Sequence, residues 1–464
     1  MNSTKAPLSV AIIGGGMGGL AAACAMGRAG LKVDIFEQAP AFGEVGAGLN
    51  LGPNTVRTLG FMGLGEAYDS VAEVDKAGGL FFEWWDGIKD TYTKYPRSAV
   101  HRARLLECLH DSLPETVTIH LGIQILGVSN LPDSKKARVH FTARGVPKVD
   151  PPSVDGGAHI ANGSTPTNTP TPKEEYFEAD VVVGADGVKS LTRTLLELPS
   201  PPEAGDKADK PSGFRYTGTY CYRALIPMDQ ALGVDPPNSE EVGNTLHRAR
   251  MAFGPGRHFT IFPIEQHSIL NVVAFVSDRS KPKDQREWQG PWLKKVDRET
   301  ILKDFEGWDE HYVNLLKLVP ESQRIQWAMH EVLSPNTWRK GRITLLGDSA
   351  HGSLPHNGSG ASMAIEDAYV LAGLLARPEC NTENVEAFLD AYEEVRRPRS
   401  YKQLLHACET GEMFDWATDK WGQDTSAIAK EMLTRTDWIW DYDIREGLAD
   451  AVKILEKKGV IGAA

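Results

Sequence analysis

Glycines and acids recur in three segments of the chain, each directly after a short apolar run. The first segment holds Gly14, Gly16 and Gly19 in the spacing G-x-G-x-x-G, between an apolar run at 8–13 and small residues at 20–26. In this spacing the first glycine allows a tight turn, the second lets the backbone approach a pyrophosphate, and the third lets a helix pack closely on a strand. The amide groups at the start of the helix then face the phosphates. The segment therefore predicts a phosphate-binding turn.

The next apolar run, 32–36, ends at Glu37. An acid at the end of the second strand can accept a hydrogen bond from a ribose hydroxyl. Strand, turn, helix, strand and acid together predict a dinucleotide site, and they fit NAD and FAD equally well. The alternative is a glycine-rich turn that binds no ligand.

Two later segments favour FAD. Asp186 follows the apolar run 181–184, and Asp348 follows the run 342–346. Acids in these positions lie at the carboxyl end of a parallel sheet, where such sheets bind ligands. After the second acid, glycines precede a helix that begins at Ala361, and a glycine-rich loop at a helix N-terminus is a further site for an anionic group. The alternative for each segment is a turn in which Asp caps a helix.

At these motifs the chain resembles the single-component FAD-dependent aromatic hydroxylases, the group A flavoprotein monooxygenases that include salicylate hydroxylase and para-hydroxybenzoate hydroxylase. The resemblance covers roughly residues 8 to 400 and rests on the glycines from Gly14, the GADG at 184–187 and the GDSAHGSLPHNGSGASMAIEDA at 347–368. The last segment is most similar to fungal salicylate hydroxylase-like enzymes.

The resemblance implies an enzyme with noncovalent FAD that uses NADPH or NADH and O2. It implies hydroxylation of a phenolic or salicylate-like aromatic substrate through a C4a-hydroperoxyflavin. Two alternatives stay open at this point. One is a flavin epoxidase or hydroxylase of a non-aromatic or prenylated natural product, and the other is a non-catalytic flavin redox sensor.

The resemblance also implies cofactor contacts. Glu37 is the expected ribose ligand, Asp348 the ribityl ligand, and Arg102 matches an arginine that contacts the cofactor, although the family often has Asp where this chain has Arg104. Glycines within 46–52 suit a flavin that swings outward to meet NAD(P)H. The expected cofactor-binding residues are Gly14, Gly16, Gly19, Glu37, Gly48, Arg102, Asp186, Asp348, Gly360 and Ala361.

On the substrate side, Arg223 lies in a strand-like run and matches an arginine that some fungal relatives use to bind substrate. Pro355 and His356 lie in the third motif, close to the expected position of the flavin ring, where His356 can hydrogen-bond a phenol. Both candidates have a simpler alternative, namely a surface arginine and a packed loop histidine. Relatives commonly carry Tyr where this chain has Phe262, and Phe cannot donate a hydrogen bond. The expected substrate-binding residues are Arg223, Phe262, Pro355 and His356, with Arg223 and His356 as catalytic candidates and His247 and His258 nearby.

Composition agrees with an enzyme of several domains. The chain has 464 residues, of which 41% are hydrophobic, so it can bury a large core. A formal charge of −12 argues against nucleic-acid binding, and the five scattered cysteines show no zinc-like spacing and favour a reducing, cytoplasmic environment. Neither a signal peptide nor a membrane span is expected, because the first strand begins near residue 8 and no apolar run reaches about 18 residues. A monomer or homodimer is expected.

The predicted fold is α/β: a discontinuous Rossmann-like FAD-binding domain, an antiparallel-sheet substrate domain and C-terminal helices. We expect the FAD-binding domain at 1–200 and 331–400, the substrate domain at 213–330, and the helices at 401–464. A Pro-, Gly- and Thr-rich segment, 145–175, is expected to form a long mobile loop between two hairpin strands. Strands of the substrate domain are expected at 219–226, 249–253, 259–264 and 268–277.

Overall fold

The computed structural model describes residues 7–42, 48–74, 83–85, 91–92, 98–143, 173–197, 213–234 and 246–462. Its first layer is a six-stranded sheet in which every strand pair is parallel except the one at the β19 edge. In sheet order the strands are β19 (Arg339–Lys340), β20 (Ile343–Leu345), β12 (Val181–Gly184), β1 (Ser9–Ile13), β2 (Lys32–Phe36) and β8 (Val117–His120). The three motifs therefore follow strands that lie side by side in one sheet, namely β1, β12 and β20.

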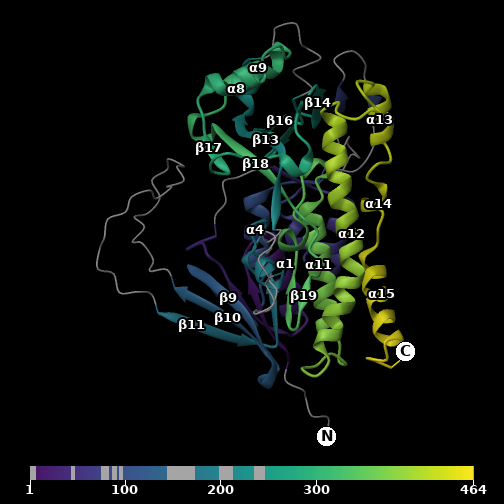
Figure 1. Ribbon diagram of the computed structural model, residues 1–464. Helices are drawn as coiled ribbons and strands as arrows, with labels where there is room; N and C mark the ends of the chain where they lie inside the picture. Colours follow the sequence, from purple (N-terminus) through teal and green to yellow (C-terminus); the bar gives the residue numbers. More distant parts are fainter. Residues whose placement is uncertain are drawn as a thin grey trace.

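Helices cover this sheet because its central strands are apolar and buried. The principal covering helices are α1 (Met17–Arg28) and α11 (Gly360–Leu375), which pack against each other (Figure 1). Small residues make up much of α1, so the two helices approach closely. The shorter helices around them are α2 (Pro53–Phe61), α3 (Gly65–Asp69), α4 (Arg102–Asp111), α5 (Leu191–Glu197) and α10 (Asp348–His351).

Two three-stranded sheets flank the parallel sheet. One contains β9 (Ile123–Leu131), β10 (Lys136–Ala143) and β11 (Glu174–Ala179), and the other contains β3 (Gly48–Leu51), β7 (Ser98–His101) and β4 (Glu73–Val74). Because β10 and β11 pair antiparallel, the predicted hairpin is confirmed. Most of the predicted loop between them lies outside the described residues.

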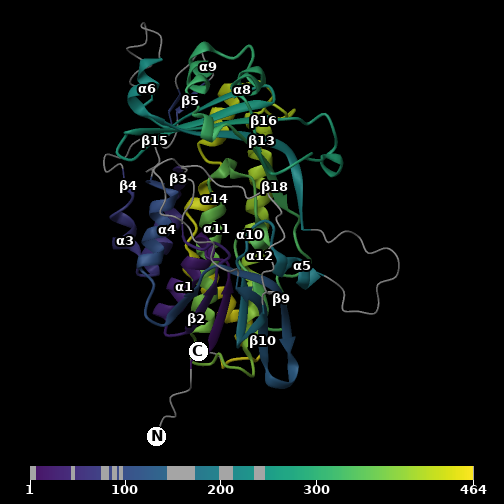
Figure 2. The same cartoon turned by 90° about the vertical axis from the view of Figure 1, so that its left-hand side faces the viewer.

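A separate eight-stranded sheet lies at one end of the molecule (Figure 2). Its strands, in order, are β17 (Leu293–Lys295), β18 (Ile325–Val332), β13 (Phe214–Pro227), β16 (Ile269–Ser277), β15 (Arg257–Ile264), β14 (Arg250–Gly254), β5 (Glu83–Trp85) and β6 (Thr91–Tyr92). All described pairs are antiparallel except β14 with β5. The outer face packs on α6 (Met228–Gly233), α8 (Arg298–Asp304) and α9 (Glu310–Lys317), and the inner face points toward α1 and α11 (Figures 1 and 2).

The 30-residue helix α12 (Val385–Phe414) runs along both sheets and ties them together (Figure 1). Outside it lie α13 (Thr425–Met432), α14 (Asp437–Trp440) and α15 (Ile444–Lys457). This arrangement confirms the predicted α/β fold with an antiparallel sheet and C-terminal helices. The predicted domain boundaries stay a prediction; β5 and β6 fall within 1–200 of the sequence, yet they pair into the eight-stranded sheet. Within the described residues, no helix is long and apolar enough to span a bilayer.

Candidate functional site

The three glycine-and-acid motifs meet at the carboxyl ends of β1, β12 and β20. Gly14 has φ +103°, and a Cβ placed on it would lie 2.5 Å from the carbonyl oxygen of Ala185. The Ser349 hydroxyl donates to the Gly184 carbonyl at 2.6 Å. The first motif therefore touches the second, and the second touches the third, as a ligand shared by all three requires.

The N-termini of α1 and α11 open onto the same region. A Cβ on Gly18 would lie 3.2 Å from the Cβ of Ala364, so the first turn of α1 contacts the second turn of α11. Neither helix has a side-chain cap, and a Cβ on Gly16 or on Gly360 would meet no atom within 4 Å. Two uncapped helix N-termini facing open space suit the phosphates and carbonyl oxygens of a flavin dinucleotide. Ala361, in the first turn of α11, is partly exposed beside this space.

The two acids expected to bind FAD, Asp348 and Glu37, differ in exposure and in hydrogen bonding. Asp348 is exposed at the start of α10, and its carboxylate has no hydrogen-bond partner within the described part of the chain. Glu37 is half-buried and accepts from the backbone N–H groups of Gly15 at 2.6 Å and Ala39 at 2.7 Å. Asp348 is thus free to accept from a ligand hydroxyl, and Glu37 also holds the glycine-rich turn. The residues present fit FAD.

Asp186 is engaged by its own turn. One carboxylate oxygen accepts from the Ser190 hydroxyl at 2.6 Å, and the other accepts from the backbone and the hydroxyl of Thr192 at 3.0 and 3.2 Å. These bonds cap α5, which is the simpler alternative that the sequence left open. A cofactor contact by Asp186 stays a prediction.

Gly48 and Arg102 lie next to each other along a strand pair. Gly48 in β3 pairs with His101 in β7, the residue before Arg102, where α4 begins. Helix α2, which follows β3, contacts α11, because the Thr55 hydroxyl donates to the Ser362 hydroxyl at 2.5 Å. The other glycines expected to accompany flavin movement lie partly outside the described residues.

A buried ionic network supports the loop that carries Asp348. The carboxylate of Asp367 accepts from the Gly347 amide at 3.0 Å and bonds His351 at 2.6 Å and Arg396 at 2.8 Å. Burial acts to raise the pKa of Asp367, but the neighbouring charges of His351 and Arg396 outweigh it, so its pKa lies below the usual value. His351 therefore anchors the loop. Glu366, the preceding residue in α11, pairs with Arg396 at 2.9 Å and with Arg399 at 2.8 Å.

Arg223 begins a row of three side chains on the inner face of the eight-stranded sheet. Arg223 in β13 pairs with Val273 in β16, which pairs with Thr260 in β15; we call these three residues the central row. Their strand neighbours on β13 and β15 pack with α8 and α9 on the outer face, so the central row points to the inner face. The central row therefore lies on the face of the sheet that is turned toward α1 and α11.

The central row is partly exposed, whereas the flanking side chains on β15 and β16 are buried. The flanking side chains on the inner face are His258 and Phe275 on one side and Phe262 and Asn271 on the other. Phe262 is 4% exposed and packs with residues of α12 and α13, which does not suit direct contact with a substrate. The exposed strip is therefore a floor with a guanidinium at one end, a hydroxyl at the other and an apolar side chain between them.

The loop with Pro355 and His356 lies over the adjoining row. The His356 ring is 4.9 Å from the His258 ring and 5.1 Å from the Phe275 ring, centroid to centroid, while Pro355 is exposed. Both His356 nitrogens are enclosed and have no hydrogen bond within the described part of the chain. Burial, with a smaller effect of His258, holds the pKa of His356 well below its usual value, so the imidazole is neutral. The structure brings the loop next to the central row but does not aim the His356 nitrogens at it.

Sequence reasoning missed two features near this site, namely the pairing of His258 with Asp415 and the position of Thr260. His258 Nδ1 bonds the Asp415 carboxylate at 2.7 Å, both side chains are fully buried, and Arg279 bonds the other oxygen of that carboxylate at 2.5 Å. No local pattern connects residues so far apart in the chain. Thr260 was also missed, although its place two residues before Phe262 in an expected strand puts both on one face. His247, in contrast, stacks on His267 with ring centroids 5.6 Å apart, away from His258.

Comparison with known proteins agrees with this geometry. A family described as an FAD binding domain matches residues 228–406, and an NAD(P)-binding Rossmann-like domain matches residues 12–56. Salicylate hydroxylase of Pseudomonas putida is 33% identical over 97% of this chain and 96% of its own length. A 6-methylsalicylate 1-monooxygenase of Aspergillus terreus is 30% identical over 96% of this chain and 92% of its own.

A solved structure described as a salicylate hydroxylase substrate complex superposes with a TM-score of 0.77 at 29% identity, and the match covers 97% of this chain and 99% of that one. The likeness thus extends over both sheets and the C-terminal helices. The chain is an FAD-dependent aromatic hydroxylase that uses NAD(P)H and O2, and it belongs to the salicylate hydroxylase-like family of FAD-binding monooxygenases.

Proposed function

We propose that this enzyme hydroxylates a phenolic acid of the salicylate type. The observation that carries the proposal is the partly exposed central row, which lies beside the row covered by the loop of Pro355 and His356. A phenolic acid needs a counter-charge for its carboxylate and an apolar surface for its ring, and Arg223 and Val273 lie side by side in the central row. Several relatives are named for salicylate or 6-methylsalicylate, which supports the same substrate class.

In this proposal Arg223 supplies the counter-charge for the carboxylate. An unpaired anion in a site that excludes water is costly, and a guanidinium can bind a carboxylate through two parallel hydrogen bonds. The guanidinium lies 5.0 Å from the centre of the Trp327 ring, which helps to hold it in position. Val273 would contact the ring, and Phe262 cannot donate a hydrogen bond to the substrate hydroxyl.

The FAD would be held by the convergent motifs. The α1 and α11 N-termini at Gly16 and Gly360 would face its anionic groups, and Asp348 and Glu37 would accept from its hydroxyls. When bound, the cofactor is reduced by NAD(P)H and supplies activated oxygen from O2. The loop with Pro355 and His356 would close the space from the cofactor side and exclude water. The neutral His356 ring fixes that loop against His258 and Phe275.

A panel of aromatic acids tests the proposal. Salicylate, benzoate, phenol and an alkyl-substituted salicylate are supplied with NADH or NADPH, and dinucleotide oxidation, peroxide and product mass are followed together. Salicylate-type acids should stimulate dinucleotide oxidation and yield a hydroxylated or decarboxylated product with little peroxide. Oxidation that ignores every aromatic would contradict the proposal and favour a flavin sensor, and oxygenation of a non-aromatic compound alone would favour the epoxidase alternative.

A further inference from the structure

The loop at 353–357, which joins α10 to α11, is fastened to one side of α12. The Ser353 hydroxyl donates to the Gln403 side-chain oxygen at 3.1 Å, and the Asn357 amide bonds His406 Nδ1 at 3.1 Å. Residues three apart share one side of a helix, so a single side of α12 carries both contacts. The loop therefore takes its position from α12.

The His356 ring fits against α12 because residue 411 is glycine. A Cβ placed on Gly411 would lie 2.5 Å from His356 Nε2, well inside contact distance. Phe414 meets the same ring edge to face, with centroids 6.3 Å apart. Glycine inside a helix weakens it relative to alanine, and here it makes room for the ring. A larger residue at 411 would push His356, and the loop with it, away from the helix.

Asp415 fastens the C-terminal end of α12 to the eight-stranded sheet. Its fully buried carboxylate bonds His258 Nδ1 in β15 at 2.7 Å and pairs with Arg279, which follows β16. Its carbonyl accepts from the Gly256 amide at 2.9 Å, in the turn between β14 and β15. Burial acts to raise the pKa of Asp415, but His258 and Arg279 outweigh it, so its pKa lies below the usual value and the carboxylate is ionised.

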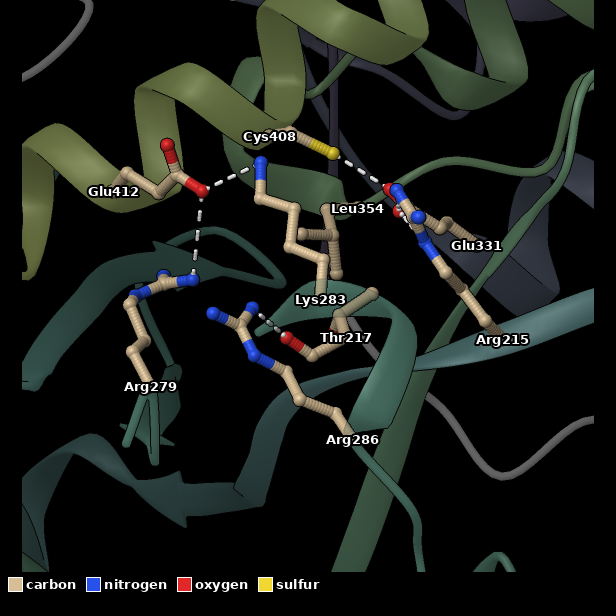
Figure 3. Close-up of a pocket in the computed structure, with 9 residues that line it drawn as sticks. All are labelled: Arg215, Thr217, Arg279, Lys283, Arg286, Glu331, Leu354, Cys408 and Glu412. Atoms are coloured by element: carbon tan, nitrogen blue, oxygen red, sulfur yellow. Dashed lines mark hydrogen bonds and ion pairs between the residues drawn. The ribbon is translucent and has the colours of Figure 1, made fainter. Parts of the chain in front are cut away.

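Ion pairs of Glu412 extend this attachment. Lys283 pairs with the Glu412 carboxylate at 2.7 Å, and Arg279 approaches it to 3.9 Å. Figure 3 shows both cations reaching Glu412 from the chain that follows β16, while Cys408, one turn earlier on α12, bonds Glu331 of β18. The end of α12 is therefore held to the sheet at several points.

One turn of α12 thus connects the loop to the floor of the substrate space. His258 precedes Thr260 by two residues in β15, so both lie on the inner face and His258 adjoins the central row. Asp415 holds α12 to His258, and Gly411, one turn earlier, receives the loop. The separation between the loop and the central row depends on these two attachments.

We propose that Asp415 and Gly411 are positioning residues for the hydroxylation, because together they set the distance between the loop at 353–357 and an aromatic ring on the central row. Both are buried, so each acts through a neighbour, Asp415 through His258 and Gly411 through His356. Reacting atoms must approach to about 3–3.5 Å for efficient transfer. The proposal rests on the central row as the substrate floor, and it applies to any aromatic substrate held there.

Two variants test this role. Asp415→Asn keeps the shape of the side chain and removes its charge, and Gly411→Ala adds one methyl group beneath His356. In each variant the product formed per NAD(P)H should fall about tenfold, whereas the KM for the aromatic substrate, which the sheet holds, should change less than about twofold. The missing electrons should appear as hydrogen peroxide formed from O2. A merely structural role would lower Tm and FAD content without this separation of yield from KM.

Asp304→Asn is the matched control. Asp304 accepts from the hydroxyls of Tyr220 and Tyr222 at 2.7 and 2.6 Å on the outer face of the same sheet, so its replacement removes the same charge away from the loop. It should leave the product yield per NAD(P)H as in wild type. A double-mutant cycle tests the route through His356: Gly411→Ala added to His356→Ala should lower the yield no further, because the displaced ring is gone.

Visible circular dichroism of the bound FAD, recorded without substrate, gives a readout that does not depend on the substrate class. The spectrum should change in Asp415→Asn and Gly411→Ala but not in Asp304→Asn. If no aromatic acid supports turnover, the proposed substrate class fails, and this spectrum alone decides on the positioning role. If Asp415→Asn does not fold, Gly411→Ala decides, because alanine favours the helix.

Wild-type yield and an unchanged FAD spectrum in the folded variants would overturn the proposal. So would a raised KM with unchanged yield, which would assign the two residues to substrate binding. Additive losses in the double-mutant cycle would show that Gly411 does not act through His356 and would overturn its part.

Discussion

Arg223 is the side chain on which the substrate proposal depends most directly. Arg223→Ala should weaken binding of a carboxylated phenol or lower its turnover by about 2–5 kcal/mol, the range for truncating one partner of a buried charge pair. FAD content should not change, because β13 belongs to the eight-stranded sheet and the FAD motifs lie at the parallel sheet. Substrate-induced change in flavin absorbance and steady-state kinetics measure both effects.

Two comparisons sharpen this experiment. Arg223→Lys should recover only part of the loss, since an ammonium cannot form two parallel bonds to a carboxylate. Binding of phenol, which has no carboxylate, should be almost unaffected in either variant. Wild-type affinity for salicylate in Arg223→Ala would exclude Arg223 as the counter-charge.

The contrast between Asp348 and Glu37 gives a second residue-scale prediction. Asp348→Ala should weaken FAD binding by about 1.5–3 kcal/mol, the worth of a hydrogen bond to a charged group. It should leave the apoprotein as stable as wild type, because Asp348 is exposed and has no protein partner in the described chain. Glu37→Ala should lower both FAD affinity and apoprotein stability, since the amides of Gly15 and Ala39 lose their acceptor. FAD titration and urea unfolding of each apoprotein separate the two outcomes.

At the scale of elements, the contact between α11 and α12 depends on a buried arginine. Arg396 in α12 is 1% exposed and bonds both Glu366 and Asp367 of α11. Arg396→Ala should destabilise the protein by about 3–5 kcal/mol, because it removes the cation shared by two buried carboxylates and leaves Glu366 to Arg399 and Asp367 to His351. FAD occupancy should fall with it, since Asp367 also holds the Gly347 amide beside Asp348. Thermal unfolding and FAD content are the measurements.

Arg397 offers a matched control on the same helix. Its side chain is 34% exposed and pairs with Glu393 at 3.1 Å. Arg397→Ala should cost about 1 kcal/mol or less, as is usual for exposed ion pairs. Similar losses in Arg396→Ala and Arg397→Ala would show that the buried network adds nothing beyond a surface pair.

The response of the whole molecule to acid follows from its buried histidines. Burial lowers the pKa of His330 and of His406 to about 4, and it holds the pKa of His356 below its usual value. Unfolded histidines titrate near about pH 6.5, so between pH 6.5 and 4 the unfolded chain binds protons that the folded chain does not. Stability should therefore be complete above pH 6.5 and decline steadily toward pH 4. Urea unfolding across this range measures the slope.

His406→Asn should make the stability fall less steeply between pH 6.5 and 4, because it removes one of the groups that take up protons on unfolding. Below about pH 4 the carboxylates with lowered pKa values, Glu366 and Asp367, should steepen the loss as they protonate. Stability that is constant from pH 6.5 to 4.5 would contradict a neutral, buried state of these histidines.

The sequence alone determined the dinucleotide fold and most of the strands that surround the site. The turn at Gly14, the strand that ends at Glu37 and the acids after β12 and β20 are local patterns, and local patterns follow from backbone geometry and side-chain periodicity. The antiparallel strands from 214 to 277 were also predictable, because apolar runs alternate there with turn residues.

Tertiary structure alone decided what surrounds the substrate space. Arg223, Val273 and Thr260 form one row only because of the register between β13, β16 and β15, and register depends on contacts between distant segments. Asp415 reaches His258 across 157 residues of chain, and no local signal links them. Spacing along the chain specifies turns and faces, whereas burial and charge balance are properties of the assembled packing.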